Sequence, residues 1–433
     1  MGYSFAAPLI YNVRTGLKEV TPAVILSNGY ESDYDDVTAG GQKATAKDSV
    51  LYILNADTGA LIKKISLPSG STGLSSPAGV DVGQDGILDY VYAGDVDGKL
   101  WRFDLTANDP SKFKVLTTPI YDAGGGHPII MRPAVMPVSK GNGDSLGNII
   151  LFGTGQLLTK ADRDSITTQS LFGVLDKMED SPTTVLQSDL VQQTLSTEFT
   201  TADSTQRAGT YRAVSSNAID LTSSTNSKLG WYINLPDSSE RLVSSPLVFE
   251  DKVLFGTGIT KTAEMCLPGG KGWVIGLNPL TGSVTRRGNS PTGKDFSFMD
   301  IKLDGKSTSA DKVKFPGGDA YVSAYKKDGI PTELSYVATS AKLVKPTNSN
   351  TDLADLGAVI ALREANSMAV YTGNQKVNGK LETGNPIQRP VATCDGSLYS
   401  GTVGSDGLDK AKMLCPGTDA ARIETTTWRE IKQ

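Results

Sequence analysis

A short apolar strand that ends in a tight turn decides the fold: LYILNADTG at residues 51–59. The run is β-branched and aromatic in character and is bounded by turn residues, as is typical of a β-strand. Asn55 supplies an Asx-type turn and Gly59 a positive φ, so we expect the strand to end in a tight hairpin. Similar strands recur as LWRFD at residues 100–104, LFGVLD at 171–176 and WVIGLNPLTG at 273–282.

Two other markers recur ahead of these strands. The first is a proline at the start of a strand, where its missing N–H costs no ladder hydrogen bond; it occurs at Pro8, Pro77, Pro133, Pro246 and Pro390. The second follows about fifteen to twenty residues later and is an apolar strand that usually ends in glycine, as at Gly29, Gly94, Gly153 and Gly256.

Repeated units of three or four short strands are typical of the blades of a β-propeller. Five units carry the proline, and their uneven spacing indicates insertions and unmarked blades, so we expect seven. Residues 359–363 resemble a strand of an unmarked blade, and 425–431 would help to close the ring. The best helical stretch, residues 160–169, has Asp, Ser and Thr where a helix needs an apolar stripe. We predict an all-β fold with one domain over residues 1–433.

Composition and charge exclude several classes of function. The chain has 433 residues, 42 basic and 47 acidic, for a net charge of −5 and a pI near 5.2. Neither a nucleic acid nor an anionic membrane surface is therefore an expected partner. A single histidine, His127, excludes a multi-histidine metal site, and no G-x-S-x-G motif accompanies it. No apolar run approaches the ~18 residues of a membrane-spanning helix.

Several longer motifs resemble the PilY/PilC family, the large pilus-tip proteins of bacterial type IV pili. They are YVYAGDVDGKLWRFDL at residues 90–105, FGTG at 152–155, GWYINLP at 230–236 and WREI at 428–431. The resemblance runs from about Phe5 to the C-terminus. It implies a modified seven-bladed, quinoprotein-like propeller with loop insertions, the C-terminal domain of a longer exported protein. The N-terminal region of that protein, with its signal peptide, would then be absent from this chain.

The strongest candidate site is DVGQDGILD at residues 81–89, directly before the longest of these motifs. Calcium binds six to eight oxygens, and Asp81, Asp85 and Asp89 occupy positions 1, 5 and 9 of a loop that could wrap the ion. Ile87, at position 7, would add its backbone carbonyl. The family carries a calcium loop of this form with Asp or Asn at position 3, where this chain has Gly83. We therefore expect weak calcium binding, about 10⁻⁴–10⁻³ M; the alternative is a polar hairpin whose aspartates only cap turns.

The resemblance implies a non-enzymatic pilus biogenesis factor and tip adhesin. It would contact minor pilins at the tip and a host-cell or abiotic surface, and through the calcium loop it would regulate pilus extension, retraction and twitching motility. It would be located at the pilus tip or cell surface, associated with the outer membrane or in transit through the periplasm. The alternative function is a quinoprotein-like dehydrogenase, which would require a pair of adjacent cysteines that this sequence lacks.

Cys266, Cys394 and Cys415 form no CxxC pair. If the domain is exported, we expect a disulfide between Cys394 and Cys415, with Cys266 unpaired.

Overall fold

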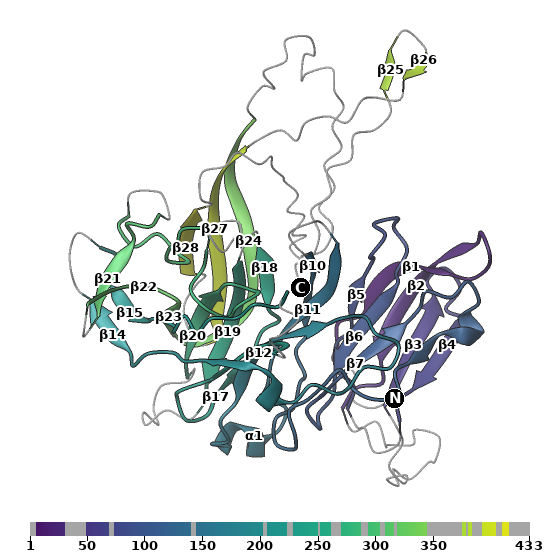
Figure 1. Ribbon diagram of the computed structural model, residues 1–433, viewed down its shortest axis with the longest axis horizontal. Coiled ribbons are helices and arrows are strands. Elements are labelled where there is room, and N and C mark those ends of the chain that lie inside the picture. The colour runs from purple at the N-terminus through teal and green to yellow at the C-terminus, as the bar shows by residue number, and fades with distance from the viewer. Residues whose placement is uncertain are drawn as a thin grey trace, which may run out of the picture.

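The structure is a computed structural model of the chain (Figure 1). It describes residues 6–30, 49–68, 73–139, 144–201, 206–222, 228–249, 252–260, 270–286, 293–303, 308–315, 318–343, 375–377, 380–382, 392–403 and 409–414. Regular structure in these residues is almost entirely strand, as predicted.

Two antiparallel sheets form the N-terminal part. The first sheet has the order β1-β2-β3-β4, with strands β1 (Leu9–Arg14), β2 (Val20–Ser27), β3 (Val50–Asn55) and β4 (Leu61–Ser66). The second sheet has the order β5-β6-β7-β8, with β9 also on β7; its strands are β5 (Ala78–Val80), β6 (Tyr90–Gly94), β7 (Lys99–Asp104), β8 (Lys114–Val115) and β9 (Tyr121–Asp122).

Two larger sheets follow. The third sheet has the order β10-β11-β12-β16-β13, with strands β10 (Ala134–Ser139), β11 (Ser145–Gly153), β12 (Ser170–Asp176), β16 (Gly230–Asn234) and β13 (Val191–Gln193). The fourth sheet has the order β14-β15-β23-β20-β19-β17, with β18 also on β19; its strands are β14 (Phe199–Thr201), β15 (Gly209–Arg212), β17 (Glu240–Leu242), β18 (Leu247–Phe249), β19 (Lys252–Ile259), β20 (Lys271–Leu277) and β23 (Ala324–Asp328).

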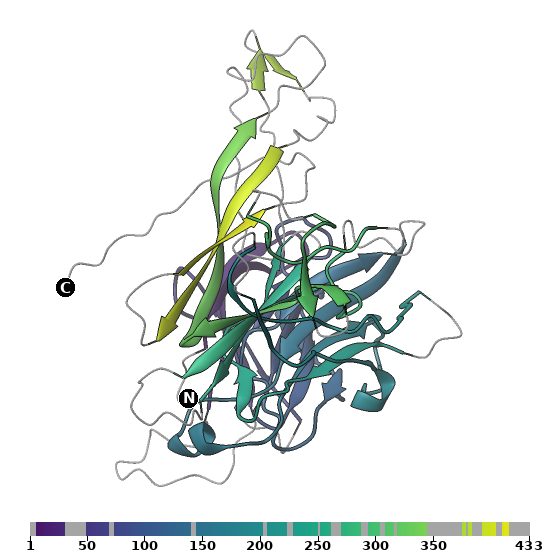
Figure 2. The ribbon, with the colours of Figure 1, turned by 90° about the vertical axis from the view of Figure 1, so that its left-hand side faces the viewer.

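The remaining strands form smaller sheets. They are β21 (Lys312–Phe315) with β22 (Gly318–Tyr321), β24 (Ile330–Leu343) with β27 (Ala392–Val403) and β28 (Asp409–Leu414), and β25 (Gln375–Val377) with β26 (Lys380–Glu382). Figure 2 shows β24 and β27 as a long pair that rises beyond the other sheets. The predicted strands at 359–363 and 425–431 lie outside the described residues, so the expected count of seven blades stays a prediction.

Consecutive sheets pack against each other in the order of the sequence, as in a propeller. β4 contacts β8, β5 contacts β10, and β12 contacts β17, and Figure 1 shows these sheets following one another from β1 on the right to β17 on the left. A separate apolar cluster fills each junction: one between the first and second sheets, one between the second and third, and one between the third and fourth.

Inner strands supply apolar residues to two of these clusters at once, because successive side chains point to opposite faces of a strand. In β6, Val91 packs between the first and second sheets while Tyr92 packs between the second and third. In β11, Ile150 packs toward the second sheet and Leu151 toward the fourth. This is why the sequence shows continuous apolar runs rather than alternation.

The turn predicted after the strand at residues 51–54 is confirmed. The side-chain oxygen of Asn55 accepts the amide N–H groups of Asp57 and Thr58, each at 2.9 Å, and Gly59 has a φ of +72°. Asn278 and Gly282 repeat the arrangement after β20. Prolines also directly precede β1, β5, β10 and β18.

The longest family motif is the hairpin of β6 and β7. Asp95 is fully buried in its turn, where it accepts the amide N–H groups of Asp97 and Lys99 and the indole N–H of Trp101 at 2.8 Å. Gly98 has a φ of +88°, and a Cβ there would lie 2.7 Å from the carbonyl oxygen of Gly124. The motif therefore specifies how this hairpin packs.

Two local expectations differ from the structure. Residues 160–169 contain a one-turn helix, α1 (Lys160–Asp164), because Thr159 and Asp162 form a capping box and the guanidinium of Arg241 binds backbone carbonyls at its end. Gly256 does not end its strand but lies inside β19, where a Cβ would lie 2.4 Å from the Ser244 hydroxyl.

Candidate functional site: the acidic loop beside strand β1

The acidic loop, residues 81–89, connects β5 to β6 and is closed by its own carboxylates. Asp81 accepts the amide N–H groups of Asp85 at 3.1 Å and Gly86 at 2.8 Å. Asp85 in turn accepts the N–H of Ile87 at 2.9 Å. The first half of the loop is thus an Asx-type turn of the kind that aspartates favour.

Asp89 closes the other half of the acidic loop. Its Oδ2 accepts the N–H of Val82 at 2.9 Å and that of Gly83 at 3.4 Å. The chain reverses at Gln84 and Gly86, which have φ angles of +52° and +84°, so the sharp turn predicted at Gly86 is confirmed.

Strand β1 of the first sheet lies beside the acidic loop and binds it through side chain and backbone. The Asn12 side chain donates to the carbonyl of Gly86 at 3.2 Å, and the Leu88 amide donates to the Asn12 carbonyl at 2.8 Å. The Tyr11 hydroxyl donates to Asp81 at 3.1 Å. The loop is therefore part of the junction between two sheets.

The guanidinium of Arg14, at the end of β1, lies between two of the loop's three carboxylates. Its Nη1 lies 2.8 Å from Asp89 Oδ1 and its Nη2 lies 3.4 Å from Asp85 Oδ2. The Asp85 side chain is 47% exposed, whereas those of Arg14 and Asp89 are 18% and 10% exposed. One cation thus neutralises part of the charge that the loop concentrates.

The sequence predicts calcium at Asp81, Asp85, Ile87 and Asp89, and the carboxylate chemistry suits that ion. The structure keeps the four residues in one turn, but Arg14 already pairs with two of the three carboxylates. Among the described residues, no group of three or more His, Cys, Asp or Glu is arranged to hold a metal ion. Arg14 therefore lies against carboxylates that calcium would need as ligands, and calcium at this loop stays a prediction.

Sequence reasoning missed Tyr11, Asn12 and Arg14 as partners of the acidic loop. Each lies 70 or more positions before the loop residue that it contacts, and no local spacing connects the two. The usable signal was the placement of an arginine at the end of the strand that opens the neighbouring sheet.

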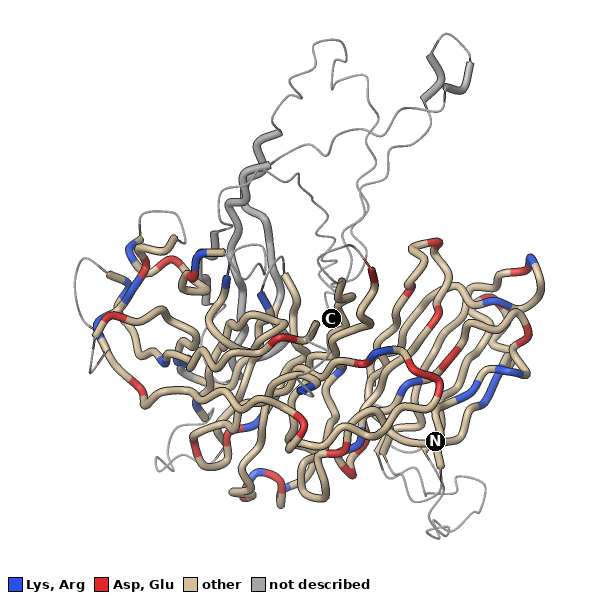
Figure 3. The backbone as a smooth tube through the Cα atoms, viewed as in Figure 1, with Lys and Arg blue, Asp and Glu red and all other residues tan. Residues whose placement is uncertain are grey.

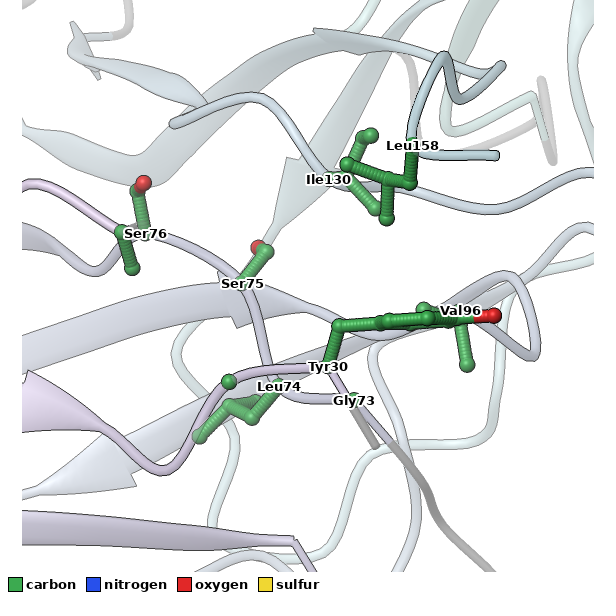
Figure 4. Close-up of a pocket in the computed structure, with 10 residues that line it drawn as sticks. Tyr30, Gly73, Leu74, Ser75, Ser76, Val96, Ile130 and Leu158 are labelled. Carbon is green, nitrogen blue, oxygen red and sulfur yellow. The ribbon is translucent and has the colours of Figure 1, made fainter. Parts of the chain in front are cut away.

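A small pocket lies beside the starts of β1, β5 and β10 and the ends of β2, β6 and β11 (Figure 4). It is lined by Ala6, Gly29, Tyr30, Gly73, Leu74, Ser75, Ser76, Val96, Ile130 and Leu158. None of these is a carboxylate, histidine or cysteine, and the Ser75 hydroxyl accepts the N–H of Gly94 at 3.1 Å. The pocket therefore offers no acid–base pair or thiol for catalysis.

Two buried arginines also pair with carboxylates, one between the second and third sheets and one within the fourth sheet. Arg102 on β7 binds Asp176 at the end of β12, at 2.7 Å. Arg212 on β15 pairs with Glu240 at 3.1 Å, and its guanidinium lies 3.8 Å from the centre of the Trp273 ring. Trp101, Trp231 and Trp273 are buried, as predicted; Trp428 lies outside the described residues.

The predicted disulfide is not tested by the structure. Cys394 lies on β27 opposite Ala341, but Cys266 and Cys415 lie outside the described residues. Within the part of the chain that the structure describes, no helix is long and apolar enough to cross a membrane. Basic and acidic residues are interspersed along the described backbone (Figure 3).

Relatives of this chain are pilus proteins. The type IV pilus biogenesis factor PilY1 of Pseudomonas aeruginosa is 30% identical over 373 residues, which cover 76% of this chain and 29% of that protein. A PilY1 homolog of Xylella fastidiosa is 29% identical over 333 residues, covering 68% of this chain and 20% of the relative. The chain thus spans less than a third of the length of these two curated relatives.

A similar solved structure and a matching family also belong to PilY1. The crystal structure of the Pseudomonas aeruginosa PilY1 C-terminal domain is 27% identical and superposes with a TM-score of 0.63, covering 78% of this chain and 70% of that one. Residues 1–207 match the family described as the PilY1 beta-propeller domain. The predicted resemblance to this family and the all-β propeller fold are therefore confirmed.

Proposed function

We propose that this chain acts in type IV pilus biogenesis as a non-enzymatic propeller domain. The observation that carries the proposal is the likeness to PilY1 in both sequence and fold: 30% identity to a named pilus biogenesis factor and a TM-score of 0.63 to its C-terminal domain. We further propose that the domain is located at the pilus tip or cell surface and contacts minor pilins there. It would attach to host or abiotic surfaces and take part in the control of pilus extension, retraction and twitching.

The geometry supports a binding domain over an enzyme. Two buried arginines are neutralised by buried carboxylates: Arg102 by Asp176 between two sheets, and Arg212 by Glu240 within one sheet. The lining of the pocket in Figure 4 is small and apolar, apart from Tyr30 and two serines. A quinoprotein-like dehydrogenase would bind its quinone, so an absorption spectrum of the purified protein with a quinone band in the near ultraviolet would favour that alternative.

The proposal is tested by deleting the coding region of this chain from its gene in the bacterium that carries it. We expect fewer surface pili and a smaller twitching zone, with normal levels of the major pilin. Copurification of minor pilins with the tagged product of that gene should also be lost. Unchanged piliation, twitching and copurification would contradict the proposal.

Calcium control through Asp81, Asp85, Ile87 and Asp89 stays a prediction of the sequence. An isothermal titration of the purified domain with calcium, up to the ~10⁻³ M expected for weak extracellular sites, tests it. The position of Arg14 leads to a different account of the same loop.

A further inference from the structure

We propose that Arg14 supplies, in this chain, the positive charge that closes the acidic loop, so that the loop is ordered without calcium. The inference concerns the domain alone and does not depend on its role in pili. It rests on three features of the described residues: where Arg14 lies, how β1 holds it there, and what residue occupies position 83.

The acidic loop needs a nearby cation because it brings three carboxylates into nine residues. Like charges this close repel each other, and the backbone N–H groups that bind them carry only partial charges. Arg14 reaches the two carboxylates nearest to β6, Asp85 and Asp89, with separate nitrogens. A guanidinium is always charged, and its rigid fork can bridge two acceptors as one small ion would.

Strand β1 holds Arg14 in place independently of the ion pairs. Arg14 is paired with Val20 in the ladder of β1 and β2, and two residues earlier Asn12 binds the loop through its carbonyl and its side chain. The β-ladder therefore fixes the Arg14 backbone at the edge of the loop, so that only side-chain rotamers remain to be ordered when the ion pairs form.

Position 83 lacks a metal ligand: a calcium loop of this spacing uses an oxygen ligand there, and this chain has glycine. Gly83 is not forced by the backbone: a Cβ at this position would meet nothing closer than Asp85 Cγ, at 3.8 Å. An aspartate would therefore fit and would place its carboxylate beside Asp85. The chain lacks a metal ligand that its backbone could carry, and it has an internal cation at the same site.

The experiment measures amide hydrogen exchange across residues 80–90 of the purified domain, in EDTA and in about 5 mM calcium, which exceeds the weak-site range. The wild type should show the same protection in both. Arg14→Gln should exchange faster than wild type in both. Gly83→Asp combined with Arg14→Gln should regain protection only with calcium, and Gly83→Ala combined with Arg14→Gln should not.

A saturable rise in wild-type protection with calcium would overturn the proposal and support the calcium prediction instead. Unchanged exchange in Arg14→Gln would overturn it too, because the guanidinium would then do nothing for the loop. If Arg14→Gln does not fold, the comparison of the wild type with and without calcium still shows whether calcium orders the loop. None of these exchange results bears on the proposed pilus role, because that role is tested separately by piliation and twitching.

Discussion

Two arginines join neighbouring sheets of this propeller with the same chemistry in different surroundings. Arg14 reaches from the first sheet to the acidic loop of the second, and Arg102 reaches from the second sheet to Asp176 of the third. Their shortest contacts are alike, 2.8 and 2.7 Å, but the side chains of Arg102 and Asp176 are only 3% and 1% exposed. Asp85, by contrast, is 47% exposed.

The difference in exposure decides what each pair can do. Water screens the pair at the acidic loop, so other cations can compete there at little cost. The buried pair is surrounded by low-dielectric protein, where losing one partner leaves an uncompensated charge. We therefore expect the Arg102 pair to maintain the fold and the Arg14 pair to set the order of one loop.

The largest expected effect comes from breaking the buried pair. Arg102→Met leaves Asp176 charged and without its guanidinium partner inside the junction of the second and third sheets. Removing one member of a buried pair typically costs about 3–5 kcal/mol, so the free energy of unfolding measured by urea denaturation should fall by this amount.

Replacing both partners is the matched control for that loss. The double variant Arg102→Met and Asp176→Leu removes both charges, and apolar replacements of buried pairs are often close to neutral. We expect it to regain most of the lost stability. Because Asp176 also accepts the Tyr92 hydroxyl, the double variant is compared in the Tyr92→Phe background; if it is no more stable there than Arg102→Met, packing rather than the stranded charge causes the loss.

Local features of both regions could be predicted from the sequence, whereas the arginine partners could not. The Asn55 turn, the prolines before strands and the aspartates of the acidic loop are encoded within about ten residues of chain. Arg102 and Asp176 lie 74 positions apart, and Arg14 and Asp85 lie 71 apart. Such pairs are set by which sheets become neighbours, a property of the whole fold rather than of any local pattern.

The next largest effect is a dependence of stability on pH that arises at the buried pair. Burial first, and then the charge of Asp176, hold the pKa of Tyr92 well above its ordinary value of 10.0; its hydroxyl donates to Asp176 at 2.8 Å. Because the pKa of Tyr92 is higher in the folded than in the unfolded chain, its protonated hydroxyl contributes its full stabilisation of the fold below about pH 10. This contribution to the free energy of unfolding is lost as the pH rises further, because the unfolded chain then releases the tyrosine proton.

Tyr92→Phe tests this dependence. Above about pH 10 the unfolding free energy of the wild type should fall with pH, and that of the variant should fall less steeply, by up to about 1.4 kcal/mol per pH unit for one proton. Other buried tyrosines, such as Tyr121 and Tyr211, keep a residual slope in both proteins because burial raises their pKa values too. Identical slopes would show that Tyr92 ionises normally in the fold.

The smallest effect is expected at the acidic loop and is produced by salt. At about 1 M salt the screening length falls to roughly 3 Å, so exposed pairs weaken while buried ones hardly change. Global stability should therefore shift by no more than about 1 kcal/mol. Within the loop, the 3.4 Å contact of Arg14 with the exposed Asp85 should weaken before its 2.8 Å contact with Asp89.

Amide exchange can resolve that order residue by residue. The Ile87 amide depends on Asp85, and the Val82 amide depends on Asp89, so salt should speed exchange at Ile87 more than at Val82. In Arg14→Gln the acceleration by salt at Ile87 should disappear or reverse, because only the repulsion between the carboxylates remains to be screened. An equal salt response in the variant would mean that the loop's carboxylates are held by their N–H groups alone, and that Arg14 lies beside them without ordering them.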